Sequence, residues 1–401
     1  DFKSKIEFSF SGTDADKNTA TVKLQNTYDF ISTEGFELVW EVVKNGNVAG
    51  TSQMKLDAIA PEADKLVTLD LKGVQLKDAA AAGEEVMLNL YVKDMQERTW
   101  AAAGHLIAQQ QFELSKRGNL PELRVNSRVG KLEIAKDEKS LTVKNSFIEG
   151  TFCLATGQMT ALKVNGMDVI YGKEGFIYDN HRWIENDGFK QTENGLNATG
   201  TCEATETADG KVIVKTTRDG SLCGTKSNYT FLPNGVMDMD VKFLPKTANL
   251  RRTGLVCSVN AGLDNVDYYA YGPWENYIDR KEGCMVGRYH TTVKDMVERY
   301  VKPQSMGNRE GLRELKLTNK QGEGIRIETE GNVSFSTLRY TDADLMNAKH
   351  MWELQERPCI ILHLDAQIRG LGNASCGPET LQTYKIPLMP VSFKLRISAC
   401  N

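Results

Sequence analysis

Short segments in which apolar and polar residues alternate one by one run through almost the whole chain. Residues 37–42 and 212–217 are examples. In each, the apolar side chains would share one face of a β-strand, because successive side chains point to opposite faces. Turn sequences such as Asn45-Gly46 favour hairpins between such segments. Helical spacing is indicated only at residues 342–350, with Asp342 as the N-cap. The pattern therefore predicts an all-β fold.

The alternating segments are shorter in the first part of the chain than in the rest. About seven of them within residues 1–114 predict an immunoglobulin-like β-sandwich, with Trp40 in its core. Residues 115–122 include Gly118 and Pro121, and we expect them to form a linker. Longer alternating segments over residues 123–401 predict a second domain, a large antiparallel sandwich.

Composition excludes several classes of function. The net charge of −4 provides no basic surface for nucleic acid. No run of 18 apolar residues is present, so no membrane span is predicted. The chain begins at Asp1 without an initiator Met or a signal peptide, and we expect it to be processed or part of a longer protein. We therefore predict a soluble protein that is cytoplasmic, periplasmic or secreted, depending on the missing N-terminus.

The sequence contains no recognisable metal-binding or catalytic motif. Its eight cysteines form no Cys-x-x-Cys pair, so neither a zinc site nor a disulfide framework is predicted, and most cysteines are expected to be buried apolar residues. Phosphate-binding loops, His-Glu-x-x-His and Gly-x-Ser-x-Gly are absent. No alternation of strands and helices predicts a (β/α)8 barrel.

Residues 268–280 combine aromatic and polar side chains more densely than the rest of the chain. After Gly272 and Pro273 interrupt an aromatic strand, six such residues follow: Trp274, Glu275, Asn276, Tyr277, Asp279 and Arg280. One interpretation is a sugar-binding surface, in which aromatic faces lie beside polar groups. The other, which we favour, is a structural corner in which Asp279 pairs with Arg280 and the aromatics fill space.

This stretch resembles a known family. Residues 272–280 read Gly-Pro-Trp-Glu-Asn-Tyr-Ile-Asp-Arg and are similar to a motif in the last domain of large β-galactosidases of glycoside hydrolase family 2. Further segments resemble the same family in the same order. They are residues 103–112, 182–187, 289–309, 313–315 and 370–378.

The resemblance implies that the chain is the C-terminal part of a retaining β-galactosidase. An immunoglobulin-like domain would be followed by a terminal supersandwich of the galactose-mutarotase-like kind. The two catalytic glutamates of the family lie in a barrel that this sequence does not contain, so no catalytic residue is assigned here. The partners implied are that barrel and a galactoside, with oligomers possible in the parent. Any Mg or Na ion would belong to the barrel, with no cofactor in this chain.

The resemblance also places candidate substrate-binding residues at the rim of the galactose pocket. One loop contributes Asn373, Ser375 and Cys376, where well-known members have a Trp directly after Ser that can stack on a sugar. A second candidate loop contributes three polar residues, Arg182, Asn186 and Asp187.

The alternative is a stand-alone module, either a carbohydrate-binding surface or a mutarotase-like epimerase. An epimerase requires a general acid and a general base beside the anomeric centre, usually His with a carboxylate. The candidates in the second domain are His290, His350 and His363.

Overall fold

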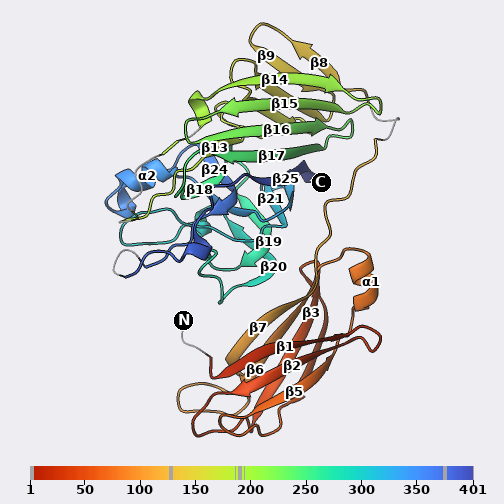
Figure 1. Cartoon of the computed structure of the whole chain (residues 1–401), viewed down its shortest axis with the longest axis vertical. Helices are drawn as coiled ribbons and strands as arrows, with labels where there is room; N and C mark the ends of the chain where they lie inside the picture. Colours follow the sequence, from red (N-terminus) through yellow and green to blue (C-terminus); the bar gives the residue numbers. More distant parts are fainter. Residues whose placement is uncertain are drawn as a thin grey trace. The chain divides into compact units, whose positions relative to one another are not determined.

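The computed structural model describes residues 4–125, 130–185, 187, 192–193, 195–373 and 377–400. These residues form two compact units (Figure 1). The first comprises Asp1–Asn119 with Met285–Arg288, and the second comprises Leu120–Cys284 with Tyr289–Asn401. Both consist mainly of antiparallel strands, so the predicted all-β class is confirmed.

The first unit contains two antiparallel sheets. The three-stranded sheet has the order β1 (Ile6–Asp14), β2 (Thr19–Asn26) and β5 (Asp64–Asp70). The four-stranded sheet has the order β4 (Asn47–Lys55), β3 (Phe36–Lys44), β6 (Val86–Asp94) and β7 (His105–Ser115). Asn45 and Gly46 form the turn between β3 and β4, both with positive φ, as a two-residue hairpin requires.

Trp40 connects the two sheets of the first unit. Its side chain on β3 is 7% exposed and packs in the core with residues of both sheets. Its indole Nε1 donates to the carbonyl of Asp70 on β5 at 2.9 Å. The expectation that Trp40 fills this core is therefore confirmed, and its polar nitrogen is satisfied across the core.

The second unit contains three sheets. A five-stranded sheet has the order β12 (Met167–Asp168), β11 (Met159–Val164), β10 (Ile148–Cys153), β9 (Ser140–Lys144) and β8 (Glu133–Lys136). A four-stranded sheet has the order β13 (Ile177–Asp179), β18 (Arg252–Asn260), β24 (Cys359–Ile368) and β23 (Ser334–Leu338). A nine-stranded sheet has the order β14 (Thr199–Glu206), β15 (Val212–Asp219), β16 (Cys223–Phe231), β17 (Met237–Pro245), β25 (Val391–Cys400), β22 (Gly324–Glu330), β21 (Glu314–Thr318), β19 (Asn265–Gly272) and β20 (Met285–Thr292) (Figure 1).

The nine-stranded sheet packs against both smaller sheets. Phe152 on β10 lies with its ring centroid 6.2 Å from that of Phe231 on β16. Tyr178 on β13 lies 6.2 Å from Phe243 on β17, centroid to centroid. Gly150 makes the first contact possible, since a Cβ there would lie 2.4 Å from the Phe231 ring. The second unit is therefore a sandwich with one aromatic-rich core.

The helices differ from the prediction in two ways. The helix expected at residues 342–350 is α2, Asp342–Asn347, and its N-cap is Thr341 rather than Asp342. Thr341 Oγ1 accepts from the Asp344 amide at 3.2 Å, and the Asp344 carboxylate accepts from the Thr341 amide at 2.8 Å. This capping box fixes the helix start. A second helix, α1 (Leu76–Ala81), was not predicted, because six residues are too few to establish helical spacing.

Seven cysteines lie in the described part of the chain, and all are free thiols; Cys202, Cys223, Cys257 and Cys359 are buried. Among the described residues, no helix combines the length and apolar character needed to span a membrane. Along the chain, β12 of the five-stranded sheet is followed by β13 of the four-stranded sheet. The coil that follows β13 leads into the region where polar side chains gather.

Candidate functional site

Four segments that are far apart in the sequence meet around one cavity of about 380 Å³ in the second unit. They are the coil after β13, the turn after β19, the coil between β20 and β21, and the coil after β24. We call this the rim cavity. It is lined by Ile184, Glu185, Asp187, Glu275, Tyr277, Arg280, Tyr300, Gln304, Ser305, Leu371 and Gly372. The lining thus joins four of the segments that resemble the β-galactosidase family, residues 182–187, 272–280, 289–309 and 370–378.

Asp187 anchors the first of these segments. Its Oδ2 accepts from Arg182 Nη2 at 3.0 Å and from Arg251 Nε at 2.7 Å. Arg251 Nη2 also donates to the Asp187 carbonyl at 2.7 Å. The two arginine side chains are almost fully buried, and burial lowers the pKa of Arg182, with Asp187 opposing the shift. Arg182 therefore lies behind the cavity wall and positions Asp187, which lines the cavity.

Glu275 is a half-buried acid that lines the rim cavity. Its two oxygens accept from Tyr277 Oη at 2.5 Å and from Tyr300 Oη at 2.6 Å. Burial raises the pKa of Glu275, although both tyrosine hydroxyls oppose this. Burial and the adjacent carboxylate raise the pKa of both phenols. The arrangement fixes the two rings and leaves them as neutral donors at physiological pH.

Asn276 holds the turn from inside. It is fully buried, and its Nδ2 donates to the carbonyls of Tyr271 and Trp274 at 3.1 and 2.8 Å. Its Oδ1 accepts from the Glu310 amide at 2.9 Å. Trp274 does not line the rim cavity and is 69% exposed. The turn is therefore braced by backbone contacts through Asn276 rather than by stacking of Trp274.

Asp279 and Arg280 do not pair with each other among the described residues, contrary to our expectation. Instead both bind the coil after β24. Asp279 accepts from the amides of Leu371 and Gly372 at 3.0 and 2.8 Å. Arg280 Nη2 donates to the Gly372 carbonyl at 2.7 Å and to Asn373 Oδ1 at 3.0 Å. Adjacent side chains of opposite charge thus satisfy the amides and the carbonyl of one loop.

The candidate rim residues have different placements. Asp187 lines the rim cavity, Arg182 supports it from behind, and Asn373 lies at its edge through Arg280. Asn186, Ser375 and Cys376 lie outside the described residues.

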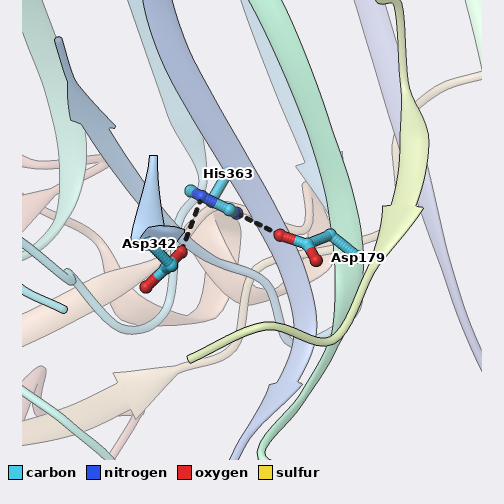
Figure 2. Close-up of side chains that lie close together, drawn as sticks. All are labelled: Asp179, Asp342 and His363. Carbon is cyan, nitrogen blue, oxygen red and sulfur yellow. Dashed lines mark ion pairs between the residues drawn. The ribbon is translucent and has the colours of Figure 1, made fainter. Parts of the chain in front are cut away.

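A second polar cluster lies within the four-stranded sheet. Asp179 ends β13, Asp342 begins α2, and His363 lies on β24. Figure 2 shows His363 between the two carboxylates. His363 Nε2 is 3.4 Å from Asp342 Oδ2, and His363 Nδ1 is 3.9 Å from Asp179 Oδ2. The sequence analysis named His363 as one of three histidine candidates for an epimerase, with no carboxylate assigned to it.

Arg252, on β18, is the cation at the centre of this cluster. Its Nη1 donates to Asp342 Oδ2 at 2.9 Å and to the His181 carbonyl at 2.8 Å, and its Nε pairs with Asp365 Oδ2 at 3.0 Å. Gly254 permits the approach of Asp365, since a Cβ at Gly254 would lie 2.0 Å from Asp365 Oδ1.

The buried groups of this cluster have strongly shifted pKa values. Burial raises the pKa of Asp179 and of Asp365 to about 7 each, with Arg252 opposing the shift. Burial also acts on Asp342, but Arg252 and His363 outweigh it and hold the pKa of Asp342 well below its usual range. Burial and Arg252 lower the pKa of His363 to about 4. His363 is therefore neutral at physiological pH.

Asp179, Asp342 and His363 satisfy the spacing of a metal site, since one ligand atom from each lies within 4.8 Å of the others. However, Arg252 Nη1 lies 2.9 Å from Asp342 Oδ2 and 3.1 Å from His363 Nδ1. A metal cation would face this guanidinium at short range in a buried site, where repulsion is strong. The arrangement therefore fits an ion-pair network around Arg252 better than a metal centre.

The two clusters are connected through Asp342. Its Oδ1 accepts from the hydroxyl of Ser305, which lines the rim cavity, while its Oδ2 faces Arg252. Sequence reasoning missed Arg251 and Arg252 because strand β18 was not predicted. The only available signal was the doubled arginine before an apolar segment at residues 254–257.

Two family models match this chain. The model described as "Beta galactosidase small chain" matches residues 144–397, and the model described as "Beta-galactosidase, domain 4" matches residues 22–115. The first falls within the second structural unit apart from Met285–Arg288 and covers more than half of the chain. The second falls within the first unit.

Two β-galactosidases are similar in sequence to most of this chain. The β-galactosidase of Priestia megaterium is 24% identical over 87% of this chain and 34% of its own length. That of Pseudoalteromonas haloplanktis is 25% identical over 94% of this chain and 38% of its own length. The chain thus spans little more than a third of these relatives.

Among solved structures, a galactose 1-epimerase from Lactobacillus acidophilus matches 69% of this chain and 98% of its own, with 10% identity and a TM-score of 0.37. The family assignment rests on the sequence models, whose matches agree with the order of the motifs that line the rim cavity. The chain belongs to the β-galactosidase small-chain family.

Proposed function

We propose that these 401 residues are the C-terminal, non-catalytic portion of a β-galactosidase that hydrolyses terminal β-D-galactosides when intact. The observation that carries the proposal is the meeting of four family-like segments around the rim cavity. Residues needed only to stabilise a sandwich would not have to gather polar side chains around an open cavity. A rim that completes a sugar pocket requires such a gathering, because sugar hydroxyls need donors and acceptors in fixed positions.

The rim residues would contribute in different ways. Arg280 is exposed and uses one nitrogen for Gly372 and Asn373, so its remaining N–H groups could donate to a sugar hydroxyl. Asp187 would act as an acceptor held by Arg182 and Arg251. We include Asn186, Ser375 and Cys376 in the rim on the strength of the family resemblance alone.

The catalytic groups would be supplied by a barrel domain in the same protein, which is the main partner of this portion. Any Mg or Na ion would be held there, and the portion described here would support assembly as well as the rim. The reading frame upstream of Asp1 tests this point directly. A barrel-encoding sequence in that frame is expected, and a stop codon with no barrel upstream would refute the proposal.

A kinetic experiment on the barrel-containing protein tests the rim. Arg280→Ala should raise KM for a chromogenic β-galactoside by about fivefold to tenfold, which corresponds to one lost hydrogen bond of about 1 kcal/mol. The value of kcat should change little if the contact is equally strong in the ground and transition states. Lys320→Ala, in an exposed turn far along the sequence, is the matched control. Identical kinetics for both variants would contradict the rim assignment.

A further inference from the structure

A second cavity, of about 290 Å³, opens beside the cluster of Arg252, Asp179, Asp342 and His363, and we call it the inner cavity. It shares no lining residue with the rim cavity. Its wall combines apolar and polar side chains. They include Ile177, Val256 and Ile361 on the apolar side and Asp179, Ser258 and His363 on the polar side. Sites for small ligands begin at about 300 Å³, so the space suits a molecule of monosaccharide size and excludes much larger ones.

Asp179 presents to this cavity an oxygen that accepts no hydrogen bond from the described residues. Its Oδ1 accepts from the His181 amide at 2.9 Å. In the part of the chain that the structure describes, Asp179 Oδ2 accepts no hydrogen bond, and the nearest ring nitrogen, His363 Nδ1, is 3.9 Å away (Figure 2). Asp179 is only 6% exposed. Because Asp179 lines the cavity, a ligand hydroxyl placed there could donate to Oδ2.

The charges around the cavity select the class of ligand. Asp342 and Glu174 also line it, so an anion would be repelled. Two arginines also lie close to the cavity. Arg252 contacts Asp342, and Arg357 lines the cavity while it donates to Asp344 at 2.9 Å. A metal cation would therefore be repelled as well. A neutral molecule with several hydroxyls meets neither repulsion. Its hydroxyls can donate to Asp179 Oδ2 and to Ser258 Oγ, which acts as an acceptor because its own proton is donated to Glu174 Oε2 at 2.9 Å.

We propose that this cavity binds a neutral polyhydroxylated molecule of monosaccharide size, at a site separate from the rim cavity. One hydroxyl would donate to Asp179 Oδ2 and a neighbouring hydroxyl to Ser258 Oγ, while the His363 ring forms part of the wall. The proposal does not depend on the rim function, because the two cavities are lined by different residues. Substitutions in one cavity can therefore be tested without altering the other.

Methyl NMR on the chain labelled at isoleucine δ1 tests the proposal. Ile177 and Ile361 report the inner cavity, and Ile184 reports the rim cavity. Substitution of each by Val assigns its signal. Titration with D-galactose and D-glucose is expected to give saturable shifts at Ile177 and Ile361 with at least one of the two sugars.

Substitutions at two positions of helix α2 provide the test and its control. Ala343 lines the inner cavity and takes no part in the Arg252 network, so Ala343→Phe should fill the space and weaken binding at least tenfold, with a smaller loss for Ala343→Leu. Met346 lies on the same helix, is 39% exposed and does not line the cavity, so Met346→Phe should leave the shifts unchanged. Unshifted methyl signals elsewhere confirm that each variant is folded.

Several results would overturn the proposal. They are the absence of saturable shifts at Ile177 and Ile361 with both sugars, or unchanged sugar affinity in Ala343→Phe. The same shifts produced by MgCl2 or by inorganic phosphate would overturn the assigned ligand class. Shifts confined to Ile184 would place sugar binding at the rim cavity alone, which would support the rim function and refute the inner site.

Discussion

Replacing Asp279 with Ala should destabilise the second unit through the loop after β24 rather than through Arg280. Asp279 accepts two backbone hydrogen bonds, from Leu371 at 3.0 Å and Gly372 at 2.8 Å. Arg280 is exposed and bonds to the same loop. Removal of the carboxylate therefore leaves two amides without their acceptor, but it does not leave a buried cation.

The magnitude follows from these contacts. A hydrogen bond to a charged group contributes about 1.5–3 kcal/mol. Asp279 is half-buried, so water can partly replace each bond and the low end applies. We expect Asp279→Ala to lower the free energy of unfolding by about 2–3 kcal/mol. For a unit of this size, that corresponds to a fall in Tm of about 4–6 °C.

Differential scanning calorimetry, with the transition of each unit resolved, measures this effect. Asp279→Asn keeps one acceptor oxygen and should lose about half as much stability. Arg280→Gln is the adjacent control and should lose less than about 1 kcal/mol, because its interactions are exposed. An unchanged Tm for Asp279→Ala, or an equal loss for Arg280→Gln, would refute the reasoning.

Three further predictions concern other parts of the second unit. Burial raises the pKa of Asp179 to about 7, so the contribution of Asp179 to the free energy of unfolding falls as pH rises from about 4 to about 7. Asp179→Asn carries no titrating carboxyl at this position and avoids this loss. Between pH 4 and pH 8, its free energy of unfolding in urea should therefore rise by up to about 4 kcal/mol relative to the wild type. A variant whose relative stability is independent of pH would contradict this. Gly150→Ala would place a methyl 2.4 Å from the Phe231 ring and should cost about 1–3 kcal/mol by calorimetry; no change would show that the ring moves freely. Thr341→Ala removes the N-cap bond to Asp344 and should cost about 1 kcal/mol, whereas Thr341→Ser should retain most of it.

The sequence contained enough information for the fold class, because burial of one strand face imposes an alternation that few other folds produce. Trp40 and the Asn45-Gly46 turn were predictable for the same reason, since each satisfies a local requirement. Helix α1 was not predictable, because Leu76 and Ala79 alone carry its buried face. The N-cap of α2 was misplaced because Thr341 and Asp342 are both good caps, and only tertiary pairing of Asp342 with Arg252 decides between them.

The rim cavity could be anticipated only through family resemblance. Alternation places side chains on a face of a strand, but it cannot say which loops meet in space. The Arg252 cluster could not be anticipated at all, because a buried arginine contradicts the hydrophobic pattern by which strands are recognised. Asp179 and Asp365 were ordinary acidic residues in the sequence, and their unusual environment arises from contacts with distant strands.

The most direct test of the account is an assay of these 401 residues alone with a chromogenic β-galactoside. The β-galactosidase of Priestia megaterium, which shares 24% identity with this chain, serves as the positive control. The account predicts that the release of the chromophore equals the rate without protein at every substrate concentration. A saturable rate in excess of that background, reproduced in independent preparations and proportional to the amount of chain, would contradict the proposal that this portion is non-catalytic.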